Sequence, residues 1–134
     1  MMKKLVIGEK AFIIKKFSKD DVLEYLKLSG DSNPIHFDDE YALNTPFKSC
    51  IVPGIMVGSL FGGLLGSELP GNGTIHLGQT MNFKNPVYIN EEINVMIEIV
   101  KIRTDKPIVT FKTICIKENG DIGIEGEAVV KYLE

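Results

Sequence analysis

The spacing of apolar residues changes along this chain, from helical intervals in the first half to alternation in the second. Ser18 is a good helix-capping residue, and apolar residues recur at helical intervals from Val22 to Leu28. These features predict an amphipathic helix that ends at Gly30, because glycine commonly follows the last helical residue. The run Ala11–Ile14, before this helix, predicts a short strand.

A second helix is expected from Gly54 to about Gly66, because Pro53 suits the start of a helix. Its side chains are apolar nearly all round, so we expect it to be buried on most faces. Each interior glycine costs about 1 kcal/mol relative to alanine. Something must therefore come very close to this helix, either neighbouring strands or a ligand, at the interior positions Gly58, Gly62 and Gly63.

Alternating apolar residues in the second half predict antiparallel strands with one face on a core, as in Ile93-Val95-Ile97-Ile99. Turn-forming residues separate the expected strands, which are Thr74–Phe83, Glu92–Arg103, Ile108–Lys117 and Ile122–Tyr132. One apolar helix followed by long antiparallel strands predicts an α+β fold in which the sheet curls around the helix and buries it. The open edges of such a sheet favour a homodimer.

Composition restricts the class of protein further. The chain has 134 residues and no linker, so we expect a single domain over residues 1–134. Its net charge of −3 gives no electrostatic footprint for nucleic acid. The longest apolar run, Ile51–Leu65, is too short to span a membrane, and no signal peptide is expected. Cys50 and Cys115 match no metal-site spacing, so we expect a soluble cytoplasmic protein with reduced thiols.

The loop Gly30–Asp38 holds the first candidate chemistry. Pro34 fixes its own φ and disfavours a helical conformation at Asn33, so the segment is expected to be a tight, rigid loop. Such a loop would direct Asp31 and His36 at a shared point, where an acid and a base can hold one water for addition to an activated double bond. The alternative is structural, with Asp31 capping a turn and His36 half-buried.

The start of the second helix offers another group. The first N–H groups of a helix have no partner within it, and the helix dipole places partial positive charge there. Pro53 has no N–H, so Gly54 is the first donor, and its lack of a side chain lets an acceptor approach. A thioester carbonyl bound there would be polarised as enolate charge develops.

These residues lie within a recognisable pattern. The segment Gly30-Asp31-Ser32-Asn33-Pro34-Ile35-His36 resembles the hydratase motif of the MaoC-like, R-specific enoyl-CoA hydratases, which have the hot-dog fold. The resemblance extends in order over nearly the whole chain, and it is nearest to the short hydratases that feed polyhydroxyalkanoate synthesis. The further segments that resemble the family are 51–54, 59–66, 69–71, 77–79, 83–87 and 126–131.

The resemblance implies reversible syn hydration of a trans-2-enoyl-CoA to an (R)-3-hydroxyacyl-CoA, a hydro-lyase reaction of fatty acid metabolism. Asp31 and His36 would hold and activate the water, and the Gly54 N–H would bind the thioester oxygen. The division of acid and base roles within the pair stays open, because the two groups can titrate as a unit. The substrate is a coenzyme A thioester, and no cofactor or metal is expected.

Two positions depart from the family pattern. Family members commonly have His-Gly where this chain has Pro53-Gly54, and close relatives have a serine at the position of Gly62. Ser59, one helical turn earlier, is a candidate to compensate. The remaining candidates for substrate contact are Met56, Leu60 and Phe61 for the acyl chain and, unless it is only a solvated side chain, Lys84 for the phosphates of coenzyme A.

Two other functions fit parts of the pattern. A hot-dog thioesterase would use the same helix start, but such enzymes usually need a carboxylate on or near the central helix. Residues 54–66 contain none, and Glu68 lies beyond them. A non-catalytic acyl-CoA binding subunit is favoured by Pro53 and Gly62, whereas the intact pair in the loop argues against it. His76, the other histidine, is expected to be a surface or packing residue.

Overall fold

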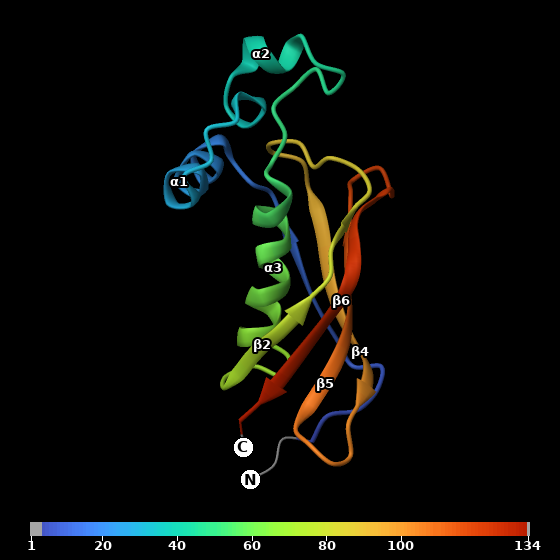
Figure 1. Ribbon diagram of the computed structural model, residues 1–134. Helices are drawn as coiled ribbons and strands as arrows, with labels where there is room; N and C mark the ends of the chain where they lie inside the picture. Colours follow the sequence, from blue (N-terminus) through green and yellow to red (C-terminus); the bar gives the residue numbers. More distant parts are fainter. Residues whose placement is uncertain (1–3, 134) are drawn as a thin grey trace.

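The structure, a computed structural model that describes residues 4–133, is an antiparallel sheet curled around one long helix (Figure 1). The strands are ordered β1-β4-β5-β6-β2, and β3 pairs with β6. The predicted α+β fold is confirmed, while residues 1–3 and 134 of the expected domain lie outside the described residues. The strands are β1 Lys10–Lys15, β2 Thr74–Gln79, β3 Asn82–Phe83, β4 Ile93–Ile102, β5 Ile108–Ile116 and β6 Ile122–Tyr132.

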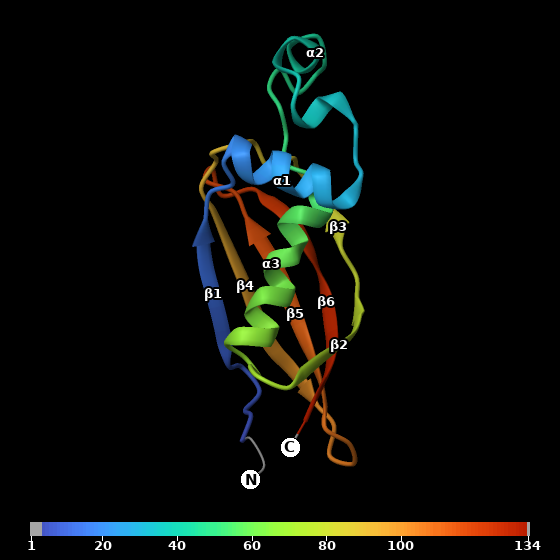
Figure 2. The ribbon, with the colours of Figure 1, turned by 90° about the vertical axis from the view of Figure 1, so that its left-hand side faces the viewer.

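The central helix α3, Gly54–Ser67, packs along the inner face of the sheet (Figure 2). Phe61 and Leu65 are only 0% and 1% exposed and lie in the main core. The opposite side of the helix is open, because Ile55 is 56% exposed and Ser59, one turn later, is exposed as well. The helix is therefore buried on one broad side, less completely than its composition predicts. None of the helices in residues 4–133 is long and apolar enough to cross a membrane.

Two glycines of α3 lie against β3 and the residue before it. A Cβ atom added at Gly58 would overlap the sulfur of Met81, and one added at Gly54 would lie 2.5 Å from Cε1 of Phe83. At Gly63, by contrast, no described atom outside the helix's own backbone and the chain neighbours comes within 4 Å of an added Cβ. The close approach expected for this helix therefore comes from the sheet, and it is confined to the first half of the helix.

The helix α1, Lys19–Ser29, matches the sequence prediction at both ends. The Ser18 hydroxyl accepts a hydrogen bond from the Asp21 N–H (3.1 Å), and Oδ2 of Asp21 accepts one from the Ser18 N–H (2.9 Å). This reciprocal pair is a capping box, which satisfies two backbone donors at the helix start. Gly30 ends the helix with a φ of 76°, a left-handed conformation that glycine adopts without strain.

A short segment between α1 and α3 projects beyond the sheet (Figures 1 and 2). It contains the 3₁₀ turn η1, Pro34–His36, and the helix α2, Asp39–Leu43. Ile35, Ala42 and Cys50 form a small core of their own in this segment, separate from the main core around α3. The candidate loop is therefore held by local packing as well as by its connection to the sheet.

The predicted strand Thr74–Phe83 is divided into β2 and β3, so its continuity was wrongly predicted. At the break, the Thr80 N–H donates to the Glu127 carbonyl (2.8 Å), and the Thr80 hydroxyl accepts from the Glu127 N–H (2.9 Å). The Thr80 backbone occupies the space that a side chain would need at Gly126 of β6. Because this approach depends on another strand, no local signal marks it.

Pro53 lies directly before the first helical residue of α3. Its ψ of 132° is not helical, so it is the N-terminal cap of the helix.

Candidate active site

The loop between α1 and α2 is held by its own side chains. Oδ1 of Asp31 accepts a hydrogen bond from the Asn33 N–H (2.9 Å), and Oδ1 of Asn33 accepts one from the Ile35 N–H (3.3 Å). Pro34 then opens the 3₁₀ turn, as its fixed φ allows. Asp31 thus caps a turn, as the structural alternative predicts, while its other oxygen, Oδ2, is directed at His36.

His36 is buried, with 9% of its surface exposed, and its ring is fixed at one edge. Nδ1 lies 2.8 Å from the carbonyl oxygen of Ile51, and because a carbonyl can only accept, Nδ1 carries a proton and donates it. In the neutral ring Nε2 is then an acceptor, and it faces Oδ2 of Asp31 at 3.7 Å. This separation exceeds a direct hydrogen bond, so the two groups approach a common point without satisfying one another.

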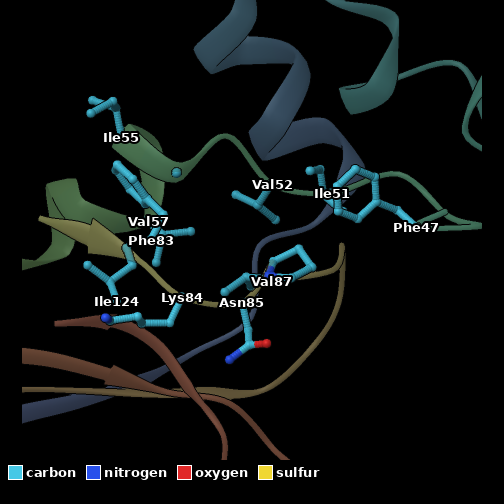
Figure 3. A pocket seen from close by; sticks show the side chains of 12 residues that line it. Phe47, Ile51, Val52, Ile55, Val57, Phe83, Lys84, Asn85, Val87 and Ile124 are labelled. Atoms are coloured by element: carbon cyan, nitrogen blue, oxygen red, sulfur yellow. The ribbon is translucent and has the colours of Figure 1, made fainter. Parts of the chain in front are cut away.

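An apolar hollow of about 430 Å³ opens beside the start of α3 (Figure 3), within the size range of ligand pockets. Ile51, whose carbonyl holds the His36 ring, forms part of its wall, as does Gly54. One short segment therefore connects the buried histidine to the hollow, although Asp31 and His36 do not line it. Other apolar residues that line the hollow are Phe47, Val52, Ile55, Val57, Phe83, Val87 and Ile124.

The start of α3 meets this hollow at Gly54. The first hydrogen bond of the helix joins the Val57 N–H to the Pro53 carbonyl (3.1 Å), so the N–H groups before Val57 precede the helical ladder. The ring of Phe83 covers the Cα of Gly54. A ligand oxygen at this helix end would thus meet backbone donors and partial positive charge beside an aromatic wall.

The other predicted substrate residues are divided between the core and the surface. Met56 and Phe61 are 6% and 0% exposed and belong to the main core, and Leu60 packs against that core. Ser59 lies on the exposed side of α3, where its hydroxyl donates to the Met56 carbonyl at 2.5 Å. Of these five candidates only Lys84 lines the hollow.

The two remaining polar candidates lie near the surface. The ammonium group of Lys84 is 3.6 Å from a carboxylate oxygen of Glu125, and both side chains are about half exposed. Such a pair is weak in water, so a phosphate group can compete for the lysine. His76 lies on β2, where its Nε2 is 3.0 Å from Oε1 of Gln79. Among residues 4–133, no group of three or more His, Cys, Asp or Glu side chains is arranged to hold a metal ion.

A buried ion pair, which the sequence did not indicate, holds the wall behind the hollow. The side chains of Lys117 and Glu91 are 7% and 13% exposed, with 3.2 Å between Nζ and Oε1. Lys117 also donates to the Pro86 carbonyl and lies 5.1 Å from the centre of the Tyr88 ring. Tyr88 forms an isolated β-bridge with Ile51. The cluster therefore positions the segment whose carbonyl accepts the proton of the histidine.

Both cysteines are free and buried. Burial raises the pKa of the Cys50 thiol, and its hydrogen bond to Oδ1 of Asp39 (3.4 Å) adds to the effect. Burial also raises the pKa of the Cys115 thiol to about 11. Because the thiolate is the nucleophilic form, neither cysteine is prepared for nucleophilic catalysis.

The aromatic walls of the hollow were not among the residues predicted from the sequence. Phe47 lies in the loop after α2 and Phe83 forms half of β3. They are 38% and 52% exposed, and Figure 3 shows both at the edges of the hollow. Their position relative to Gly54 depends on how three separate segments meet, so no pattern within any one segment identifies them.

Comparison with known proteins places these features in a family. Residues 8–119 match the model of the MaoC like domain. The chain is 43% identical to the (R)-specific enoyl-CoA hydratase of Aeromonas caviae over 127 residues, which is 95% of each chain. It is also 44% identical over 126 residues to a mitochondrial 3-hydroxyacyl-[acyl-carrier-protein] dehydratase of Solanum lycopersicum, covering 92% of this chain and 75% of that protein.

The solved structures agree with the sequence comparison. The (R)-hydratase from A. caviae, described as involved in polyhydroxyalkanoate biosynthesis, overlays with a TM-score of 0.96 at 42% identity, covering 98% of this chain and 100% of that one. An overlap this complete extends over the sheet, the central helix and the projecting loop. The predicted hot-dog fold is therefore confirmed.

Proposed function

The chain belongs to the family of MaoC-like domains, and on that premise we propose that it is an (R)-specific enoyl-CoA hydratase. As a hydro-lyase, it adds water reversibly to a trans-2-enoyl-CoA and gives an (R)-3-hydroxyacyl-CoA. The observation that carries the proposal is the 3.7 Å approach of His36 Nε2 and Asp31 Oδ2, on the segment that resembles the hydratase motif. The relatives from A. caviae and Rhodospirillum rubrum, both named (R)-specific enoyl-CoA hydratases, support it.

Water is activated between the two side chains. Because Nδ1 of His36 is engaged with the Ile51 carbonyl, the exchangeable proton of the pair resides on Nε2 or on the Asp31 carboxylate. Whichever group lacks this proton accepts one from water, and the resulting hydroxide forms a bond to C3 of the substrate. The other group donates its proton to C2 on the same face. The sum is addition of one water: the pair has gained one proton and lost one, so its net charge is unchanged, and proton exchange with solvent returns the remaining proton to its starting position.

The thioester carbonyl is assigned to the start of α3. Protonation of C2 is preceded by negative charge on the thioester oxygen, and a fixed backbone donor stabilises that charge without reorganisation. The N–H of Gly54 is the first donor of the helix, and the apolar hollow beside it excludes the water that would otherwise weaken the interaction. This contact strengthens in the transition state, so it acts mainly on kcat.

The remainder of the substrate is assigned to the hollow and its rim. Lys84 lines the hollow and pairs only weakly with Glu125, so we propose that it meets a phosphate of coenzyme A. Met56, Leu60 and Phe61 stay candidates for the acyl-chain wall, on the buried side of α3, and Ser59 stays a candidate for polar contact. The thioester itself is the reactant, and we propose that the reaction needs no further cofactor.

The proposal also includes the oligomeric state of the enzyme, its location in the cell and its metabolic role. Exposed apolar side chains on the edge strand β2, Ile75 and Leu77 (48% and 53% exposed), favour a homodimer. Two free, buried cysteines suit the reducing cytoplasm. We also propose a role in fatty acid metabolism that supplies polyhydroxyalkanoate synthesis, because the similar (R)-hydratase from A. caviae is involved in polyhydroxyalkanoate biosynthesis.

A second carrier for the acyl group deserves a direct test, because a relative at 44% identity is named as a dehydratase of acyl-carrier-protein thioesters. The experiment offers crotonyl-CoA, its longer trans-2-enoyl homologues and crotonyl-acyl-carrier protein to the enzyme. Loss of the conjugated enoyl absorbance with formation of the (R)-3-hydroxyacyl-CoA supports the proposal. Preference for the carrier-protein thioester would assign the second function instead. Release of free thiol would indicate a thioesterase, and tight binding without turnover would indicate a binding subunit.

A further inference from the structure

The apolar hollow beside Gly54 has two different sides. Figure 3 shows Phe83 and Lys84 on one side of it and Ile51 on the other. The Ile51 carbonyl holds the His36 ring, so the second side is the one nearer the histidine. The volume of about 430 Å³ is in the lower part of the range for ligand pockets, so the hollow has room for one part of an acyl-CoA.

The part of the substrate that reaches the hollow follows from the proposed function, on which this inference rests. In that reaction the thioester oxygen meets the Gly54 N–H, while C2 and C3 lie beside Asp31 and His36. Within the thioester, C1 is bonded to the oxygen, to C2 and to the sulfur. From Gly54 the acyl carbons therefore lead toward the pair, and the sulfur leads away from it. Because neither Asp31 nor His36 lines the hollow, the side that holds Phe83 and Lys84 lies on the sulfur side of the carbonyl.

We infer that this side of the hollow binds the pantetheine arm of the substrate, with Phe83 as the contact that determines how tightly the arm is held. The pantetheine arm is the chain of methylene and amide groups that joins the sulfur to the phosphates of coenzyme A. Gly54 meets the thioester at one end of the arm, and Lys84 is proposed to meet a phosphate at the other end. Because both residues line the same hollow, the arm between these two ends passes along the Phe83 ring.

The ring of Phe83 contacts the start of α3 and is still half exposed to water. A Cβ atom added at Gly54 would lie 2.5 Å from its Cε1, so the ring packs directly over the Gly54 Cα. Phe83 is nevertheless 52% exposed, and methylene groups that cover it remove apolar surface from water. The amide groups of the arm can then stay at the open rim, where water meets their hydrogen-bonding needs. The floor beside the ring consists of apolar residues that are at most 4% exposed, Val57, Val87 and Ile124.

The segment that carries Phe83 and Lys84 is fixed to the neighbouring strand. Phe83 belongs to β3, which pairs with β6. Directly after it, the Lys84 N–H donates to the Gly123 carbonyl (2.8 Å), and the side-chain amide of Asn85 donates to the Ile122 carbonyl (2.8 Å). A wall that is held in this way loses little freedom when a ligand binds, so both contacts of the arm are formed in advance.

The test compares substrates that share the pantetheine arm and differ at one of its ends. Crotonyl-CoA and trans-2-octenoyl-CoA differ in the acyl chain, whereas crotonyl-pantetheine lacks the nucleotide. Phe83→Ala should lower kcat/KM by about tenfold for all three substrates. The loss should lie mainly in KM, because contact with the arm is equal in the ground state and the transition state. Phe83→Leu keeps part of the apolar surface and should lose less.

Phe12→Ala is the matched control, since Phe12 is a phenylalanine of β1 that is 66% exposed and does not line the hollow. It should keep wild-type kinetics, and thermal unfolding confirms that each variant is folded at the assay temperature. A binding measurement by NMR titration uses S-methylpantetheine, which is the arm without acyl group or nucleotide. Its Kd should rise about tenfold in Phe83→Ala and stay unchanged in Phe12→Ala. Because this measurement needs no turnover, it separates a failure of the proposed hydration from a failure of the assignment of the arm.

Three results would overturn the inference. A loss in Phe83→Ala that changes with acyl length would place the acyl chain against the ring, and a loss that is absent with crotonyl-pantetheine would place the nucleotide there. Unchanged binding of S-methylpantetheine by Phe83→Ala would remove the ring from the binding site. Acyl-carrier protein bears the same arm, so Phe83→Ala should lower kcat/KM for crotonyl-acyl-carrier protein by the same factor. The wild-type ratio of kcat/KM for the two carriers then identifies which of them supplies the arm.

Discussion

Two buried side chains with basic nitrogen atoms, Lys117 and His36, are held in very different ways in this molecule. Lys117 has its donors occupied by Glu91 at 3.2 Å and by the Pro86 carbonyl, and it lies against the Tyr88 ring. His36, almost equally buried, is bonded at Nδ1 only, and its Nε2 stops 3.7 Å short of Asp31. A polar group whose partners are all within the protein stabilises the fold. A buried histidine such as His36, whose Nε2 has no hydrogen-bond partner at close range and faces a carboxylate, can instead bind and activate a reactant.

Substitutions of Asp31 and His36 in the loop between α1 and α2 should have the largest effect on activity. Asp31→Asn and His36→Ala should each lower kcat for hydration by about a hundredfold or more, because a positioned acid or base contributes about 10²–10⁴ in rate. Thermal unfolding should change little for Asp31→Asn, since an amide oxygen can still accept the Asn33 N–H. Initial rates on crotonyl-CoA measure the loss. Turnover near the wild-type rate in either variant would remove that residue from the chemistry.

The donor at the helix start should give the next largest effect. Gly54→Val keeps the N–H but crowds the approach to it, so we expect a loss of about 2–4 kcal/mol in kcat/KM, comparable to removal of an oxyanion donor. The structure adds a complication, because any Cβ at this position would lie 2.5 Å from the Phe83 ring. The exposed Phe83 must move in both Gly54→Ala and Gly54→Val.

A control separates crowding at the Gly54 N–H from displacement of the Phe83 ring. The Phe83→Ala variant removes the ring, and Gly54→Val/Phe83→Ala then tests crowding at the N–H alone. If the double variant regains the rate of Phe83→Ala, the ring and not the carbonyl contact explains the loss. If the loss persists in the double variant, the thioester oxygen lies at this helix end.

The fully bonded lysine should show the opposite behaviour from the histidine. Lys117→Met leaves Glu91 buried without its partner, which typically costs about 3–5 kcal/mol of stability. Chemical denaturation measures this change, and the removal of both charges in Lys117→Met/Glu91→Leu should recover a large part of it. At a temperature where Lys117→Met remains folded, kcat should fall less than tenfold. A hundredfold fall in kcat without loss of stability would contradict the distinction between the two sites.

The smallest effect concerns the buried thiol of Cys115. Burial raises its pKa from the ordinary value of 9.0 to about 11, so between these values the unfolded chain loses a proton that the folded chain keeps. Stability from this group is complete below pH 9 and is lost as the pH rises toward 11. Cys115→Ala should therefore flatten the decline of unfolding free energy with pH in this window. An unchanged slope would show that the thiol ionises freely in the folded protein.

Local signals were sufficient for several parts of the fold and the site. Ser18 and Gly30 marked both ends of α1 because caps act within one helical turn. Pro34 and its neighbours marked a rigid loop for the same reason, and the structure brings Asp31 and His36 together on it. The α+β architecture followed from the change of apolar spacing, which is a property of each segment by itself.

Features that depend on contacts between distant segments were not predictable in this way. The break at Thr80 depends on Gly126 of β6, and the hollow depends on Phe83 reaching the start of α3. Lys117 looked like an ordinary charged residue at a strand end, because its burial follows from the positions of Glu91 and Tyr88 in a separate loop. Such contacts leave no periodic signal in the sequence.

The central claim is that one water is added from the side of the substrate on which Asp31 and His36 lie. Hydration of trans-crotonyl-CoA in D₂O, with the product analysed by NMR, tests this claim directly. The account predicts a single product with the (R) configuration at C3 and one deuteron at C2, added on the same face as the hydroxyl group, and an initial rate about a hundredfold or more lower with His36→Ala. Formation of the (S) alcohol, a mixture of diastereomers at C2, or an unchanged initial rate with His36→Ala would contradict it.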